Sequence, residues 1–185
     1  PGNSNQQGGG AITLETSDGA TFDSIVFGER EPRRWMAGSE FYRRTHSTGG
    51  GAEMAKLGEL VHLAIVYRAD DSITLFRNGV PYGSAYTPKG EGASLRSFPA
   101  QSSRVLFGLR HTGGGNAFLN GEIEEGRLYD RALSAEEIAA SFRAGAAGFS
   151  APDLAKAFTP EQRAEQARLS RKLEQLKAEL ITRYP

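Results

Sequence analysis

The fold is decided by the stretch Ser72-Ile73-Thr74-Leu75-Phe76-Arg77-Asn78-Gly79-Val80-Pro81-Tyr82-Gly83. Apolar and polar side chains alternate before Asn78, as they do in a strand with one buried face. Asn-Gly between two such runs favours a type I′ hairpin turn, because both central residues need a positive φ angle. Asp70-Asp71 predicts another turn just before the hairpin. The stretch therefore predicts two antiparallel strands joined by a two-residue loop.

Further strands are predicted on both sides of this hairpin. The run from Leu60 to Tyr67 is almost continuously apolar. Its length and its β-branched content favour a central strand over a helix. The other segments of strand-like composition are residues 11–16, 22–27, 34–37, 41–45, 103–110 and 118–129, the last holding one or two strands. Short strands separated by turn signals predict a sandwich or barrel rather than an α/β fold.

The pattern becomes helical after Ser134. Ser134-Ala135-Glu136-Glu137 is a capping box, in which the Ser and the last Glu each bind a free backbone N–H of the other. Gly145 ends this helix. A brief second helix is predicted from Ser150 to about Phe158. Thr159-Pro160 begins a third, which is predicted to run to near Arg183.

The third predicted helix carries a stripe of leucines. Leu169, Leu173, Leu176 and Leu180 are spaced four, three and four residues apart. About two heptads are fewer than the ~3–4 that indicate a coiled coil. The favoured interpretation is a helix that docks on its own or a neighbouring domain. Self-association as a dimer helix and a solvated linker are the alternatives.

Composition excludes several classes of protein. The 185 residues contain 22 basic and 22 acidic side chains, so the net charge is zero, whereas nucleic-acid-binding proteins normally carry a basic excess. The absence of Cys excludes disulfides, cysteine-ligated metal centres and thiol catalysis. Mean hydropathy is −0.45, and no uncharged apolar run approaches the ~18 residues of a membrane span. The glycine runs at 8–10, 49–51 and 113–115 lack a following Lys-Ser/Thr, so they are interpreted as loops and not as phosphate-binding sites.

Two segments carry a family resemblance. One is Val61-His62-Leu63-Ala64-Ile65-Val66-Tyr67 together with the hairpin that follows it. The other is Gly121-Glu122-Ile123-Glu124-Glu125-Gly126-Arg127-Leu128-Tyr129-Asp130-Arg131-Ala132-Leu133-Ser134-Ala135-Glu136-Glu137-Ile138. They resemble the core and the closing motif of the laminin-G-like, concanavalin A-like family. The resemblance covers about residues 8–142 and implies an antiparallel jelly-roll sandwich followed here by a helical C-terminal extension.

A narrower resemblance implies in what kind of protein the domain occurs. Residues 22–30 and 105–111 look like the planctomycete variety of the domain, which sits inside large exported multidomain proteins, often with a haem-c module. This implies an extracytoplasmic location: periplasmic, cell-surface or secreted. The chain itself contains no Cys-x-x-Cys-His haem motif. Its polar start without an initiator Met is also typical of a piece of a longer protein.

The chain departs from the family in two places. The family domain usually begins with strands that precede the segment matching residues 11–16, so the sandwich is predicted to lack its first strands and to expose an edge or an inner face. In the closing motif, Glu124 replaces an Asp and Gly126 replaces a Val. Some relatives bind calcium near the sandwich edge, and the Asp-to-Glu change argues against that site here. Calcium is the one cofactor left open, and no other is expected.

Catalysis is not predicted. Glycoside hydrolases of this fold place Glu-x-Asp-x-x-Glu on one strand face. Glu122 and Glu124 would share a face. However, the chain has Glu124 where the hydrolase pattern has its Asp, and Arg127 where the pattern has its second Glu. The His residues at 46, 62 and 111 have no metal-ligand spacing, and no Gly-x-Ser-x-Gly or His-Glu-x-x-His motif occurs.

Carbohydrate binding is the natural non-catalytic use of such a fold. The candidate ligand-binding residues are Arg34, Trp35, Tyr42, Arg43, Arg110 and His111. Arginines beside an aromatic suit an anionic or sulfated glycan, because Arg grips sulfate or carboxylate with two hydrogen bonds. The alternatives are that Trp35 is a core side chain and that His111 is a plain loop residue. Asp18, Asp23, Asp70 and Asp71 could supply calcium with oxygen ligands, although ordinary turns explain them as well.

The sequence therefore predicts three parts: a flexible segment 1–10, a jelly roll 11–149 and a helical extension 150–185. The favoured function is a non-catalytic glycan-binding module of a larger exported protein, with no nucleic-acid partner and no membrane span. The rival is a structural module that packs against neighbouring domains or a partner chain. An exposed aromatic platform would favour the first function, and a large exposed apolar face would favour the second.

Overall fold

The structure is a computed structural model that describes residues 2, 5–115, 118–146 and 159–183. Its contacts divide the chain into two units, Pro1–Arg143 and Ala144–Pro185. The predicted domain boundary after residue 149 falls outside the described residues.

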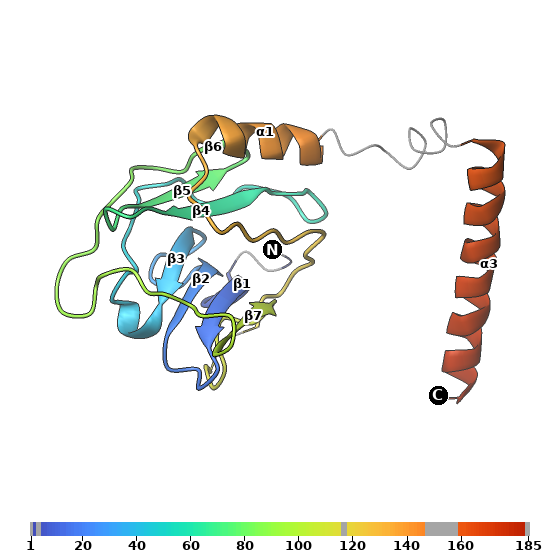
Figure 1. Cartoon of the computed structure of the whole chain (residues 1–185), viewed down its shortest axis with the longest axis horizontal. Coiled ribbons are helices and arrows are strands. Elements are labelled where there is room, and N and C mark those ends of the chain that lie inside the picture. The colour runs from blue at the N-terminus through green and yellow to red at the C-terminus, as the bar shows by residue number, and fades with distance from the viewer. Residues whose placement is uncertain (1, 3–4, 116–117, 147–158, 184–185) are drawn as a thin grey trace. The chain divides into compact units, whose positions relative to one another are not determined.

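Two antiparallel sheets form the first unit (Figure 1). The four-stranded sheet has the order β3-β2-β1-β7 and contains β1 (Gly9–Thr16), β2 (Phe22–Phe27), β3 (Trp35–Ser39) and β7 (Ser103–Phe107). The three-stranded sheet has the order β4-β5-β6 and contains β4 (Leu63–Tyr67), β5 (Ile73–Arg77) and β6 (Val80–Pro81). This confirms the predicted mainly-β, two-sheet class. β1 also takes in Gly9 and Gly10, which the sequence placed in the flexible segment.

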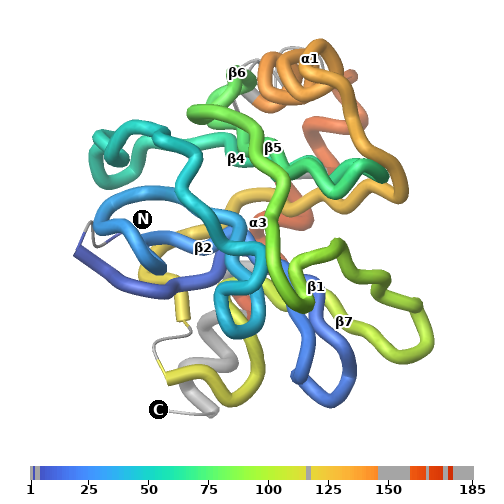
Figure 2. The backbone as a smooth tube through the Cα atoms, turned by 90° about the vertical axis from the view of Figure 1, so that its left-hand side faces the viewer, coloured from blue at the N-terminus to red at the C-terminus, as the bar shows by residue number. Residues whose placement is uncertain are grey.

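The core lies between the sheets. Period-two alternation points one side chain in two toward the opposite sheet. The four-stranded sheet contributes Phe27, Trp35 and Ala37, while Ile73 and Leu75 come from β5. Figure 2 shows β4, β5 and β6 on one side of this core and β1, β2 and β7 on the other.

The Asn78–Gly79 turn has the predicted geometry, with φ angles of 51° and 78°. Gly79 is also needed for packing, since a Cβ there would lie 3.0 Å from Phe142 Cδ1 of helix α1 (Ala135–Ala146). α1 covers the outer face of the three-stranded sheet, and its Ile138 is buried with Phe76 of β5. The glycine turn therefore sets how closely the helix approaches the hairpin.

The predicted capping box at Ser134 is confirmed, and a second one forms at Thr159, where the sequence predicted the start of the third helix. At α1, Ser134 N donates to Glu137 Oε2 (2.8 Å) and Glu137 N donates to Ser134 Oγ (3.2 Å). In the second unit, Thr159 and Gln162 exchange the same two bonds at the start of α3 (Pro160–Arg183). The predicted helix at 150–158 lies outside the described residues.

The predicted leucine stripe lies on α3. Leu169 and Leu176 are half-exposed. Docking of this helix on another domain and its self-association both stay predictions. None of the described helices is long and apolar enough to cross a membrane.

Two predicted strands are wrong. Residues 41–45 form no strand but the end of a 3₁₀ helix, η1 (Glu40–Tyr42), and the turn after it. Among the described residues of 118–129, only Phe118 makes isolated β-bridges, to Gly10 and to Leu109. A strand is defined by a neighbouring strand, and within the described residues no strand pairs with positions 119–129.

Candidate functional site

Two aromatic residues with left-handed backbone angles follow β3. Phe41 has φ 51° and ψ 22°, and Tyr42 has φ 58°. Bulky side chains seldom adopt these angles, because the Cβ atom then crowds the backbone. Phe41 is nevertheless 80% exposed, and Tyr42 is also exposed, so neither angle is explained by core packing. We name Phe41, Tyr42 and Arg43 the aromatic turn.

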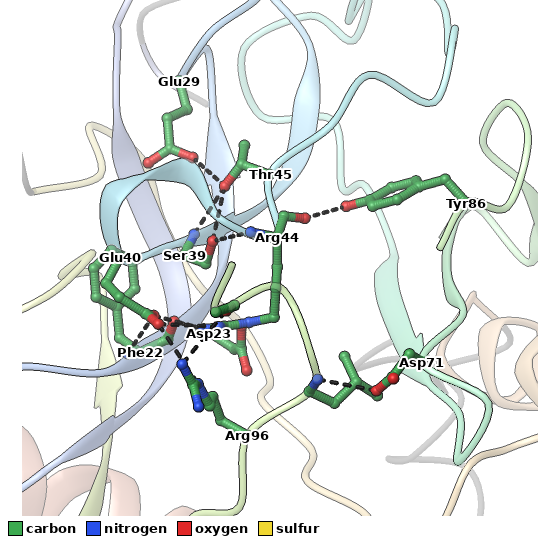
Figure 3. A network of polar contacts seen from close by, with 12 residues as sticks. Phe22, Asp23, Glu29, Ser39, Glu40, Arg44, Thr45, Asp71, Tyr86 and Arg96 are labelled. Carbon is green, nitrogen blue, oxygen red and sulfur yellow. Dashed lines mark hydrogen bonds and ion pairs between the residues drawn. The ribbon is translucent and has the colours of Figure 1, made fainter. Parts of the chain in front are cut away.

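Arg44, the next residue, ties the aromatic turn to the four-stranded sheet. Its side chain is only 1% exposed. Its Nε donates to Asp23 Oδ1 (2.8 Å), and its Nη1 and Nη2 donate to the two carboxylate oxygens of Glu40 (2.9 and 2.5 Å). Nη2 also donates to the Phe22 carbonyl (3.0 Å), as Figure 3 shows. A guanidinium has five N–H donors in a rigid plane, so these partners fix its orientation.

Further hydrogen bonds hold the backbone on both sides of Arg44 (Figure 3). Arg44 N donates to Ser39 Oγ (2.8 Å), and Ser39 N donates to Thr45 Oγ1 (3.0 Å). Thr45 Oγ1 in turn donates to a carboxylate oxygen of Glu29 (3.3 Å). The Tyr86 hydroxyl donates to the Arg44 carbonyl (2.8 Å). The aromatic turn is therefore anchored at both ends by buried polar groups.

The two carboxylates on Arg44 have different pKa values. Burial raises the pKa of Asp23 to about 6, although Arg44 acts to lower it. Burial also acts to raise the pKa of Glu40, but hydrogen bonds from Arg44 outweigh burial, and that pKa lies below its ordinary value. Asp23 is therefore the member of the pair that takes up a proton first when the pH falls.

Asp23 gives the fold a testable pH dependence. Because its pKa is raised in the folded state, its contribution to stability is complete below the unfolded pKa of 3.8 and is lost as the pH rises through about 6. We expect the wild type to lose more stability than Asp23→Asn between about pH 5 and pH 7, as measured by urea denaturation. His62 and His111 have lowered pKa values and act in the opposite direction, so the difference between the two proteins is the quantity to compare. If the stability of the two proteins changed equally with pH, the raised pKa of Asp23 would be contradicted.

Arginines surround the aromatic turn. Arg43 Cζ lies 5.2 Å from the Phe41 ring centroid, and Arg30 Cζ lies 5.5 Å from that of Tyr42. Arg96 Nε lies 3.8 Å from Glu40 Oε1. Within the described part of the chain, neither Arg30 nor Arg43 forms an ion pair. Their charges are thus available beside two exposed rings.

Of the six residues predicted from sequence, Tyr42 and Arg43 lie in the aromatic turn. Trp35 is buried in the core, where its Nε1 donates to Glu53 Oε2 (2.8 Å), so its ring offers no surface for stacking. The alternative prediction, that Trp35 is a core side chain, is therefore the one that agrees with its position. Arg34 pairs with Glu31 (2.6 Å) next to Trp35, at the opposite end of β3 from the aromatic turn.

Arg110 and His111 lie over the outer face of the four-stranded sheet. The His111 ring stacks on Phe22, with centroids 4.4 Å apart and planes 4° apart. Phe22 and its neighbour Asp23 point to opposite faces, because side chains alternate along a strand. Arg110 pairs with Glu29 (3.1 Å), which also accepts from Thr45. Within the described residues, Arg110 therefore has no hydrogen bond or ion pair with the aromatic turn, and it is linked to that turn through Glu29 and through His111.

Sequence reasoning missed Phe41, Arg30 and Arg96 at this site. The strand predicted for residues 41–45 includes Phe41, whose exposure depends instead on the left-handed turn. Arg30 and Arg96 come from distant segments and carry no local pattern. The useful signal was the sequence Phe41-Tyr42-Arg43-Arg44, because strand alternation would place one aromatic and one arginine on each face and leave neither face apolar.

The acids considered as calcium ligands accept hydrogen bonds within the chain. Asp18 accepts from Thr16 Oγ1 (2.6 Å) and from Ala20 N (3.0 Å). Asp70 accepts from Ser72 N (3.0 Å), and Asp71 from Leu95 N (3.0 Å). In residues 5–115, 118–146 and 159–183, no group of three or more His, Cys, Asp or Glu side chains is placed to hold a metal ion.

The glutamates considered for catalysis lie on an exposed segment outside the sheets. Glu122 and Glu124 are both exposed, and no strand forms around them. Arg127, which occupies the place of the second Glu of the hydrolase pattern, pairs with Glu125 (2.5 Å). The strand face that Glu122 and Glu124 would share in a hydrolase-like arrangement is therefore not formed.

Comparison with known proteins places the chain in a family. Residues 1–139 match the Laminin_G_3 family, described as the concanavalin A-like lectin/glucanases superfamily. A crystal structure from Clostridium thermocellum, of a stretch of an S-layer domain-containing protein, has 22% sequence identity and a TM-score of 0.32; the match covers 73% of this chain and 63% of that one. The chain thus matches less than two thirds of that relative's length. No curated protein shows significant similarity. Since the family match extends over most of the sequence and the two antiparallel sheets agree with it, the chain belongs to the Laminin_G_3 family of the concanavalin A-like lectin/glucanases superfamily.

Proposed function

We propose that this chain is a non-catalytic glycan-binding module whose ligand contacts the aromatic turn. The observation that carries the proposal is the pair of consecutive, exposed aromatic residues with left-handed backbone angles. Each such residue costs of order 1–3 kcal/mol and persists only where the surroundings impose it. Here the buried Arg44 network imposes it. Because these strained angles keep two aromatic side chains exposed and bury neither, we attribute them to ligand binding and not to folding.

The chemistry of the aromatic turn suits a sugar. An exposed ring offers an apolar face to the C–H groups of a pyranose, and its rigidity keeps the entropic cost of binding low. Arg30 and Arg43 offer N–H donors to hydroxyl or anionic groups beside the rings. The same proposal places the module in a larger exported protein, because the sequence resemblance is to domains of that kind.

Affinity gel electrophoresis against neutral and sulfated polysaccharides tests the proposal, with calcium and with chelator. We expect one class to retard the wild type and to lose its effect on Phe41→Gly. Leu57→Ala is the matched control, since Leu57 is an equally exposed side chain (85%) outside the aromatic turn. Retardation of Leu57→Ala should equal that of the wild type. A folded Phe41→Gly variant that is retarded as strongly as wild type would contradict the proposal.

Phe41→Gly also separates a ligand-binding role from a structural one. Glycine adopts positive φ without the Cβ clash, and the exposed ring contributes little burial. We expect the midpoint of urea denaturation to rise slightly, by roughly 0.5–1 kcal/mol of stability. A variant that is more stable but no longer binds is the behaviour of a strained functional residue. A clear loss of stability would instead make Phe41 a structural residue.

A further inference from the structure

Arg33, which lies just before β3, carries a guanidinium with weak acceptors. Its Nη2 donates to the Glu53 carbonyl (3.1 Å) and to the sulfur of Met54 (3.6 Å). Its Nε is buried and has no hydrogen-bond partner among the residues that the structure describes. Both of these acceptors are uncharged, and a thioether sulfur accepts a hydrogen bond only weakly. The charge of Arg33 would therefore gain from a stronger acceptor at the position of the sulfur.

The backbone, and not the Met54 side chain, sets the contact between Arg33 and Met54. Glu53 N donates to the Arg33 carbonyl (2.7 Å), and Arg33 holds a left-handed φ angle of 60° that long side chains seldom adopt. Met54 N donates to the carboxylate of Glu53 (2.9 Å), whose side chain is only 2% exposed. Buried partners thus hold the backbone of Met54 beside the guanidinium.

The Met54 side chain itself is open to solvent. It is 74% exposed, so hydrophobic burial does not explain its position. The chain has two methionines, and the other, Met36 of β3, is 2% exposed. A reagent in solution therefore reaches one sulfur of this protein and is kept from the other. The accessible sulfur is the one that contacts a cation.

We propose that Met54 is a site of reversible oxidation and that Arg33 holds the sulfoxide formed there. A peroxide is the oxidant. The sulfur lone pair attacks one oxygen of hydrogen peroxide, and the S–O bond forms as the O–O bond breaks. The proton on the transferred oxygen passes to the departing hydroxide, which leaves as water, so the sulfur loses the two electrons that the peroxide gains. Methionine sulfoxide reductases reverse the change.

Oxidation at this position is expected to stabilise the fold. Methionine sulfoxide usually disrupts a protein because it places a polar group in an apolar core. Met54 is exposed, so its sulfoxide loses no burial. The sulfoxide oxygen is a stronger acceptor than the sulfur, and its donor is a cation, so the hydrogen bond from Arg33 becomes stronger. This contact is separate from the aromatic turn, and the inference does not depend on glycan binding.

Treatment of the full chain with hydrogen peroxide tests the proposal. Peptide mass spectrometry follows the two methionines, and Trp35 fluorescence follows urea denaturation. We expect Met54 to gain one oxygen about tenfold faster than Met36, or faster still. The denaturation midpoint should rise by roughly 0.2–0.5 M urea as Met54 is oxidised, and a sulfoxide reductase should return it to its starting value.

Three variants separate the role of Arg33 from oxidation in general. Arg33→Gln should be oxidised at Met54 as quickly as the wild type, but its midpoint should not rise. Met54→Gln carries an amide oxygen of similar reach, so its midpoint should lie above that of the untreated wild type. Met54→Leu, the matched control without sulfur, should keep its midpoint in peroxide.

Three results would overturn the proposal. The first is an oxidised Met54 with an unchanged or lower midpoint in the wild type. The second is a rise in Arg33→Gln equal to that of the wild type. The third is oxidation of Met36 at the same rate as Met54. If Arg33→Gln does not fold, the comparison of Met54→Gln with Met54→Leu decides, and equal midpoints for these two would overturn the role of Arg33.

Discussion

Arg44→Met is expected to lower the free energy of unfolding by about 3–5 kcal/mol, because it leaves two buried carboxylates without their counter-charge. Asp23 and Glu40 both accept from this one guanidinium, and Arg96 is the other cation beside Glu40, at 3.8 Å. The Phe22 carbonyl loses a donor as well. Methionine keeps an unbranched stem like the aliphatic part of Arg but lacks the guanidinium, so the loss measures the charge and hydrogen bonds together with the space that the guanidinium filled.

Urea denaturation at neutral pH measures this loss, and a pH series adds a second readout. Without Arg44, the ionised forms of both carboxylates become more costly, so the variant should recover part of its stability on acidification. Arg168→Met is the matched control, because Arg168 and Glu165 form an ion pair that is mostly exposed. Its denaturation midpoint should equal that of the wild type. An Arg44→Met midpoint that also matched the wild type would mean that the buried network does not hold the aromatic turn.

Glu53→Ala is expected to destabilise the fold by a similar amount, about 3 kcal/mol or more, by breaking a link between the two sheets. Glu53 is almost fully buried, and Trp35 Nε1 of β3 donates to it at 2.8 Å. Arg77 of β5 donates to it through Nε (2.9 Å) and through Nη2. Alanine leaves a buried indole N–H and a half-buried guanidinium without partners.

The effect of Glu53 can be followed optically and by pH. Trp35 is the only tryptophan, so its fluorescence should shift to the red in Glu53→Ala under native conditions. Burial acts to raise the pKa of Glu53, but hydrogen bonds from Arg77 and Trp35 outweigh it and lower the pKa to about 2. Its contribution is therefore present above the unfolded pKa of 4.5 and is lost as the pH falls through about 2. Unchanged fluorescence and stability in Glu53→Ala, measured beside Glu125→Ala as an exposed control, would contradict this role.

Features that depend on near neighbours in sequence could be predicted. The Asn78–Gly79 turn, the capping box at Ser134 and the helix start at Thr159 are each decided within four residues, and all three form as expected. The alternation of β5 likewise predicted that Ile73 and Leu75 enter the core between the sheets, whereas the burial of Phe76 on the other face depends on Ile138 of α1. Local chemistry is sufficient at these positions because no distant partner competes with it.

Features decided by distant partners could not be predicted. Residues 41–45 read as a strand, yet Arg44 finds Asp23 across 21 residues of sequence and draws the backbone into a turn. The sequence around Trp35 allows either a ligand platform or a core residue. What decides for the core is Glu53, 18 residues away, which accepts a hydrogen bond from the indole N–H. The closing motif identified the family, but pairing of residues 121–129 requires a neighbouring strand that the described chain does not provide.

The order of strands in the four-stranded sheet also constrains how the domain is made. β4, β5 and β6 are consecutive in sequence and pair locally, so their hairpins can form as soon as they are synthesised. β1, by contrast, pairs with β7, and Thr13 Oγ1 bonds to the Leu109 carbonyl across 96 residues. At roughly 5–20 residues per second, β1 waits about 5–20 s on the ribosome for that partner. Such long-range pairing slows folding, so sheet completion at β7 should be the last step of folding and the one most exposed to aggregation during synthesis.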